Sequence, residues 1–315
     1  MTIAAAELLE SNSSLDLPTR GILRVVAALD NLGAREWDLR MVGVYTCAFL
    51  GMVRMTLGKK NNVAWYALIH NIVTGVGAVM AVYLDFFASE TLTGTAEPLR
   101  SCLCGGPLTS VHRIVPAITM GYGILDFLEG LNWGVDYAAH GVVTFFIMTF
   151  FVESGLPQVV VPYLLMEVSS IFLSFMRADF LTESMSVIVQ MIFAVNFFFF
   201  RIIVSPFMWY RLVNMMNEHK DEELYQSCFN PYVLPASFFV GLFFHFLNAY
   251  WFYKIVRKVR RHYSKQQKKG KAHTDRKTDT KNATRLSAIT EEDKENIRTK
   301  ANSAANDRAN GKKTR

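Results

Sequence analysis

Residues 186–208, SVIVQMIFAVNFFFFRIIVSPFM, decide the fold class of this 315-residue chain. The stretch is apolar apart from a few small polar residues and one charge, Arg201. A helix needs about 20 mostly apolar residues to cross a hydrocarbon core of about 30 Å. The stretch therefore predicts a transmembrane helix.

Further apolar windows of similar character lie on both sides of this stretch. They cover residues 41–57, 63–87, 114–131, 137–153, 158–176 and 233–256. The first window is short and is broken by Arg54, so it either crosses the membrane or lies on its surface. A soluble domain needs polar faces to cover its apolar helices, and these windows leave too few. We therefore expect an all-α fold, a multi-pass transmembrane helical bundle with six or seven spans.

The charge is distributed unevenly along the chain. Residues 257–315 contain 19 Lys or Arg but only 7 Asp or Glu, whereas the whole chain has a net charge of +6. This last part is polar and poor in aromatic residues, and such segments bury too little apolar surface to fold alone. We expect an N-terminal extension over residues 1–40, a transmembrane domain over 41–256 and a disordered basic tail over 257–315.

Basic residues at the end of the last window and directly after it predict a cytosolic C-terminus. They are Lys254, Arg257, Lys258, Arg260 and Arg261. Lys312 and Lys313 stand fourth and third from the end, which matches the dilysine pattern of proteins retrieved to the endoplasmic reticulum (ER). We therefore expect a multi-pass protein of the ER membrane, with coat-type retrieval machinery as a partner.

Several classes of site are not expected. Cys102 and Cys104 form a C-x-C, and no cysteine pair has metal-site spacing, so we expect no metal. Whether these thiols form a lumenal disulfide with Cys228 stays open. The chain has no Gly-rich phosphate loop, no H-E-x-x-H and no G-x-S-x-G, so we expect no cofactor. The basic tail lacks interleaved aromatic residues, so we expect no nucleic-acid partner.

Ionisable residues inside the apolar windows are the candidate functional residues. Each costs about 2.5–3.5 kcal/mol on insertion scales, so it usually faces the bundle interior. Asp126 and Glu129 lie three residues apart, and His140 and Thr144 lie four apart in the next window, so each pair should share a helix face. A short linker joins the two windows, so these faces are expected to meet.

Other polar residues lie in the remaining windows, and two interpretations compete. These residues are His70, Glu167, Arg201, His245 and Asn248. In the structural interpretation, such groups pair across helices and fix their packing, as Glu167 would with Arg201. In the functional interpretation, His140 and Asp126 line a reactive cavity, with the imidazole as general base near neutral pH.

Short elements around these residues resemble those of the TLC-domain membrane proteins, in the same order over residues 60–256. They are Gly121-Tyr122-x-x-x-Asp126, His140-Gly141-Val142-Val143-Thr144, Leu165–Leu173, Phe199–Ile203 and Leu247–Ile255, the last of which contains Trp251. His70 also falls where that family often has a histidine in an early span. The resemblance is closest to the small TLC-domain-containing proteins.

The resemblance implies two functions. Some members affect membrane lipid composition without a settled reaction, and the first expectation is such a role in ER lipid homeostasis. Others are ceramide synthases, which acylate a sphingoid base with acyl-CoA and are thought to need paired histidines. In this chain the second histidine is replaced by Gly141, and Ser174 stands where the family has an asparagine. An acyltransferase using His140 with Asp126 is therefore the alternative. A transporter or channel, which the buried charges alone favour, is a second alternative.

Overall fold

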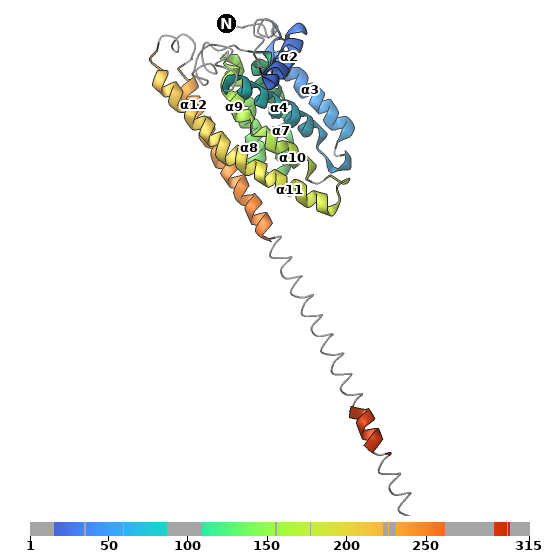
Figure 1. The fold of residues 1–315 in the computed structure, drawn as a ribbon. Helices are drawn as coiled ribbons and strands as arrows, with labels where there is room; N and C mark the ends of the chain where they lie inside the picture. Colours follow the sequence, from blue (N-terminus) through green and yellow to red (C-terminus); the bar gives the residue numbers. More distant parts are fainter. Residues whose placement is uncertain are drawn as a thin grey trace, which may run out of the picture. The chain divides into compact units, whose positions relative to one another are not determined.

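The computed structural model describes residues 16–34, 36–58, 60–86, 109–154, 156–176, 178–222, 226, 231–261, 293–300 and 302. The chain divides into two units, Met1–Phe252 and Tyr253–Arg315. All regular secondary structure in these described ranges is helical (Figure 1). Cys102, Cys104, Cys228, Lys312 and Lys313 lie outside the described residues, so the disulfide and the retrieval signal stay predictions.

Every apolar window of the sequence lies on a helix. The elements are α2 (Leu17–Asn31), α3 (Leu39–Leu57), η1 (Lys60–Asn62), α4 (Trp65–Phe86), α7 (Ser110–Trp133), α8 (Val135–Glu153), η2 (Pro157–Val160), α9 (Val161–Leu164), α10 (Glu167–Phe175), α11 (Glu183–Phe197), η3 (Phe198–Val204), α12 (Ser205–His219) and a helix over Val233–Arg261, here called helix 233–261. In the described part of the N-terminal extension lies α2, and α3 begins at its end. In the second unit, residues 293–300 form a helix.

Among the described residues, 5 helices are long and apolar enough to cross a membrane. They are Lys60–Asp85, Ser110–Trp133, Val135–Glu153, Glu183–His219 and Val233–Arg261. The pair Pro157–Leu164 and Glu167–Phe175, bent by 46°, makes 6 if it is counted as one broken span. The all-α, multi-pass bundle is therefore confirmed.

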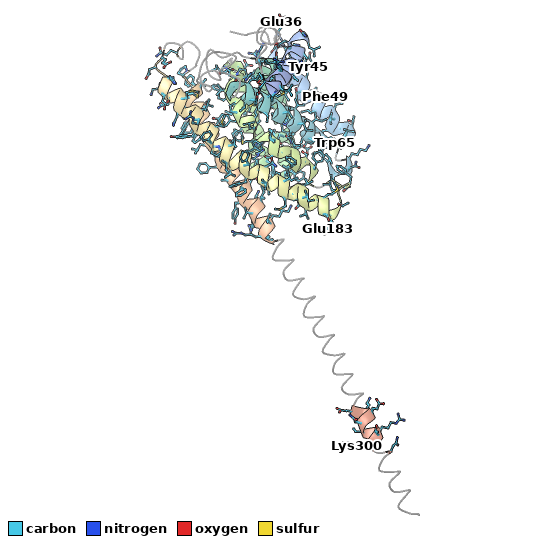
Figure 2. The ribbon with its side chains drawn as sticks, viewed as in Figure 1. Glu36, Tyr45, Phe49, Trp65, Glu183 and Lys300 are labelled. Atoms are coloured by element: carbon cyan, nitrogen blue, oxygen red, sulfur yellow. The ribbon has the colours of Figure 1, made fainter. Side chains whose placement is uncertain are left out.

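Helix α3, the uncertain first window, lies parallel to α7. Near its start, a Cβ atom on Gly43 would lie 3.3 Å from the carbonyl oxygen of Ala117 in α7. Near its end, Arg54 pairs with Glu129 of α7, with 2.6 Å between Nε and Oε1. Both helices run in the same direction, but α3 is not among the candidate spans, so the described residues give five or six spans and not seven. Tyr45 and Phe49 of α3 are exposed on the outside of the bundle (Figure 2).

Helices α7 and α8 form a tight hairpin that turns at Gly134, whose φ of 136° is unfavourable for other residues. The two backbones touch where small residues meet. A Cβ atom on Gly130 would lie 2.5 Å from the nitrogen of Ala138, and one on Gly123 would lie 2.9 Å from that of Phe145. Glycines at such crossings let transmembrane helices approach closely. This hairpin fixes the position of the polar residues on its inner side.

Prolines shape two irregular stretches of the bundle. Pro206 lacks an N–H group and so cannot continue the regular hydrogen-bond ladder, and the turn before it, η3, is π-helical. Pro162 lies in the short helix before the break that separates α9 from α10. This break makes Glu167 the first residue of α10, and Gly75 of α4 packs against it, 3.2 Å from the nitrogen of Val168 to an added Cβ atom.

Candidate functional site

Asp126 of α7 and His140 of α8 meet across the hairpin. Nδ1 of His140 lies 2.7 Å from Oδ2 of Asp126, and the two side chains are 16% and 22% exposed. Because a carboxylate only accepts hydrogen bonds, His140 donates through Nδ1, which leaves Nε2 as the proton acceptor of the neutral ring. No hydrogen bond from the described residues reaches Nε2. The pair therefore presents an oriented base within the spans.

Tyr122 holds the other oxygen of the carboxylate. Its hydroxyl donates to Oδ1 of Asp126 at 3.2 Å. The Tyr122 ring stacks on His70 of α4, with 3.8 Å between the ring centroids and 7° between the planes. His70 is buried, and its Nδ1 contacts Oδ1 of Asn71 at 3.1 Å. His70 is therefore linked to the Asp126–His140 pair by its packing against Tyr122.

Arg201, in the π-helical turn η3, is the centre of a second set of contacts. Its guanidinium donates to the hydroxyls of Ser169 at 2.9 Å and Ser170 at 2.8 Å, and to Oδ1 of Asn248 at 3.1 Å. The expected ion pair with Glu167 is present, although its atoms lie 3.8 Å apart. The arginine is thus buried with its charge shared among three neutral acceptors and one carboxylate.

Trp251 lies between these two sets of contacts. Its ring is 5.3 Å from that of His140 and 5.9 Å from the guanidinium carbon of Arg201. Its indole N–H donates to Oδ2 of Asp136 at 2.9 Å, which fixes the ring. We define the interior polar cluster by these residues: Tyr122, Asp126, His140, Glu167, Arg201, Asn248 and Trp251.

Three other candidates lie apart from the cluster. Glu129 was expected to share a face with Asp126, but it turns to Arg54 of α3 instead. Thr144 is buried in α8, one turn after His140. The ring of His245 packs 5.0 Å from that of Trp209, and among the described residues no hydrogen bond reaches either of its buried ring nitrogens.

A second His–Asp pair was not foreseen from the sequence. Nε2 of His112 lies 3.1 Å from both carboxylate oxygens of Asp85, and both side chains are buried. The pair joins the end of α4 to the start of α7, whereas Asp126 lies in the second half of α7. His112 falls just outside its apolar window, so no helix periodicity pointed to it. Within the described ranges, no three His, Cys, Asp or Glu residues are placed to hold a metal ion.

Gly141 lies where the α7–α8 hairpin is tightest, because a Cβ atom there would come closest of all to the other helix, at the nitrogen of Phe127. A Cβ atom there would lie 2.6 Å from the Cα atom of Phe127 and 2.7 Å from the carbonyl carbon of Asp126. These are backbone atoms, which cannot rotate away as a side chain does. The packing that brings His140 to Asp126 therefore excludes a second histidine at position 141.

Comparison with known families places this geometry in a known class. The family described as TLC domain matches residues 34–257, which include α3, the hairpin and the whole interior polar cluster. Comparisons with curated proteins and with solved structures gave no match. Since the match covers most of the chain, the protein belongs to the family of TLC-domain membrane proteins.

Proposed function

We propose that this protein acts in lipid homeostasis of the ER membrane by handling a lipid at the interior polar cluster. The single observation that carries the proposal is the contact between Asp126 and His140 within the spans, which orients the imidazole while no hydrogen bond from the described residues reaches its Nε2. Polar groups at this depth are costly, and they usually serve a function or pair fully with one another. Arg201 makes three hydrogen bonds and one ion pair, whereas Nε2 of His140 has no hydrogen bond from the described residues.

Lipid analysis of cells with and without the protein tests this proposal. Cells lacking the chain are complemented with the wild type, His140→Ala or His245→Ala, and their lipids are quantified by mass spectrometry. His245 is the matched control because it is a histidine of a spanning helix whose ring nitrogens receive no hydrogen bond from the described residues, so that no carboxylate orients it as Asp126 orients His140. We expect the wild type and the control to restore the lipid profile and His140→Ala to leave it altered. Full restoration by His140→Ala would refute the role of the cluster.

The Asp126–His140 pair also favours a second candidate, an acyl-CoA-dependent N-acyltransferase. Nε2 of His140 would take a proton from the amine of a sphingoid base while the amine nitrogen attacks the carbonyl carbon of the thioester. The new C–N bond forms, the C–S bond breaks, and the proton passes to the leaving thiolate to give free CoA. A neighbouring second histidine is not available for this chemistry, since Gly141 stands at that position.

An assay of purified protein separates the two candidates. The protein is incubated with a long-chain acyl-CoA and a sphingoid base, and both the amide product and the free thiol are measured. The acyltransferase predicts equal amounts of the two products, lost in His140→Ala and retained in His245→Ala. A wild-type protein that alters cellular lipids but transfers no acyl group would leave only the first candidate.

The ER location and the cytosolic C-terminus belong to the same proposal. They rest on the basic residues after the last span and on Lys312 and Lys313. Replacing both lysines by alanine should move part of the protein beyond the ER, as seen by fluorescence microscopy. An unchanged distribution would show that the dilysine is not the retrieval signal.

A further inference from the structure

Helix α2 is fastened to one end of the bundle by two aspartates. Asp16, its N-cap residue, accepts a hydrogen bond of 2.8 Å from the hydroxyl of Tyr83. Asp30, near its C-terminus, accepts one from the hydroxyl of Ser110. Tyr83 lies near the end of one candidate span and Ser110 is the first residue of the next. Helix α2 therefore lies at the level where these spans end, at the upper end of the bundle in Figure 1.

The inner face of α2 is packed against the bundle. Thr19, Leu23 and Val26 are buried, and the last two belong to the main hydrophobic core. This packing and the two aspartate contacts fix which side of the helix points away from the protein.

That outward side is apolar as well. At about 100° per residue, Leu17, Gly21, Val25, Ala28 and Leu32 fall on one narrow face, opposite Leu23 and Val26. Leu17 is 85% exposed, Val25 48% and Leu32 69%. A helix packed on one side and exposed to water on the other should be polar on its outer side, so this face needs an apolar cover.

The two flanks between these faces differ in character. One flank carries Arg20, Arg24 and Asn31, and the opposite flank carries Ile22 and Leu29. A helix lying in the plane of a membrane interface has this pattern, with its basic flank toward the headgroups and its apolar flank toward the acyl chains. Aromatic residues typical of the interface lie nearby, namely Tyr83 and the partly exposed Trp37.

We propose that α2 is an interfacial helix whose outward face, formed by Leu17, Val25 and Leu32, is covered by membrane lipid. The face contacts the boundary between headgroups and acyl chains, and Arg20 and Arg24 lie on the headgroup side. The position of α2 at the ends of the spans favours lipid over a second copy of the chain, because this level is where the membrane begins. The inference does not depend on what the interior polar cluster does.

Photo-cross-linking of the full chain in vesicles tests the inference. The photoreactive residue p-benzoylphenylalanine, which inserts into C–H bonds, replaces Val25 or Leu32 on the outward face. The matched controls place it at Arg24 or Asn31, which are exposed as Val25 and Leu32 are but lie on the basic flank. The vesicles are phosphatidylcholine with a clickable acyl chain, and adducts are identified by mass spectrometry of the peptides.

The expected result is acyl-chain adducts several-fold more abundant at Val25 and Leu32 than at Arg24 and Asn31. Using two outward positions keeps the test valid if one variant fails to fold. Equal lipid adducts at all four positions would show that the helix has no lipid-facing side. Adducts to a second copy of the chain at Val25 and Leu32 would show that protein covers this face, and either result would overturn the inference.

Discussion

Replacing Gly141 by alanine should destabilise the bundle, because the new methyl group would collide with backbone atoms of α7. The added Cβ atom would lie 2.6 Å from the Cα atom of Phe127, against an ordinary contact of 3.4–4 Å. The hairpin must therefore open by about 1 Å, and overpacking of this kind typically costs about 1–3 kcal/mol. For a domain of this size, each kcal/mol lowers the midpoint of thermal unfolding by about 2–4 °C.

The matched control is Gly51→Ala in α3, where the added Cβ atom meets only a leucine methyl group at 3.8 Å. Both variants gain the same helix propensity, up to about 1 kcal/mol, so their difference isolates the collision. The assay measures, for detergent-purified protein, the temperature at which half of the monodisperse peak is lost in size-exclusion chromatography. Equal midpoints for the two variants would refute the tight hairpin. Gly141→His, which restores the paired-histidine sequence, should be less stable still.

Three further predictions concern the surroundings of the cluster and of α2. Arg201→Lys should destabilise the protein by about 1–3 kcal/mol, because the lysine keeps the positive charge but its single ammonium group cannot reach Ser169, Ser170 and Asn248 together, which leaves a buried acceptor unsatisfied; a midpoint equal to that of the wild type in the same chromatographic assay would contradict this. Tyr122→Phe should keep the fold but lose one hydrogen bond to a carboxylate, about 1.5–3 kcal/mol, and the loss should vanish in an Asp126→Ala background, which has no acceptor, as a double-mutant cycle would show. Hydrogen bonds from Thr19 and, to a smaller extent, from Tyr83 lower the pKa of Asp16 below its ordinary value of 3.8. The ionised Asp16 therefore stabilises the folded state above that pH, and this stabilisation is lost as the pH falls below it. Hydrogen exchange of α2, corrected for the intrinsic pH dependence, should therefore speed up below about pH 4 in the wild type but not in Asp16→Asn.

The sequence was sufficient for the spans because a run of about 20 apolar residues has few alternatives to a membrane helix. Irregular geometry was harder to foresee. Pro162 and Pro206 indicate an interruption, but whether it becomes a break or a π-helical turn depends on the neighbouring helices. The break between α9 and α10 and the π-helical turn around Arg201 were therefore missed.

In the candidate site too, contacts set by the local sequence could be predicted, whereas contacts that depend on neighbouring helices could not. Asp126 and His140 were expected to meet because a short linker joins their helices, and they do. Glu129 was placed on the same face as Asp126, but side chains three residues apart on a helix still differ in direction by about 60°. This difference is enough for Glu129 to pair with Arg54 of α3. The Asp85–His112 pair joins residues separated by a long segment, and nothing in the sequence sets their distance.

The measurement that tests the account most directly is photo-cross-linking with a lipid that carries a diazirine beside its headgroup. The purified protein in vesicles is irradiated, and the adducts are mapped by peptide mass spectrometry. If the interior polar cluster handles lipid, adducts should occur on His140, Phe244 and Trp251, which pack around one another inside the bundle. Adducts confined to outward residues such as Phe146, Phe239 and Phe246 would show that lipid only surrounds the protein and would contradict the account.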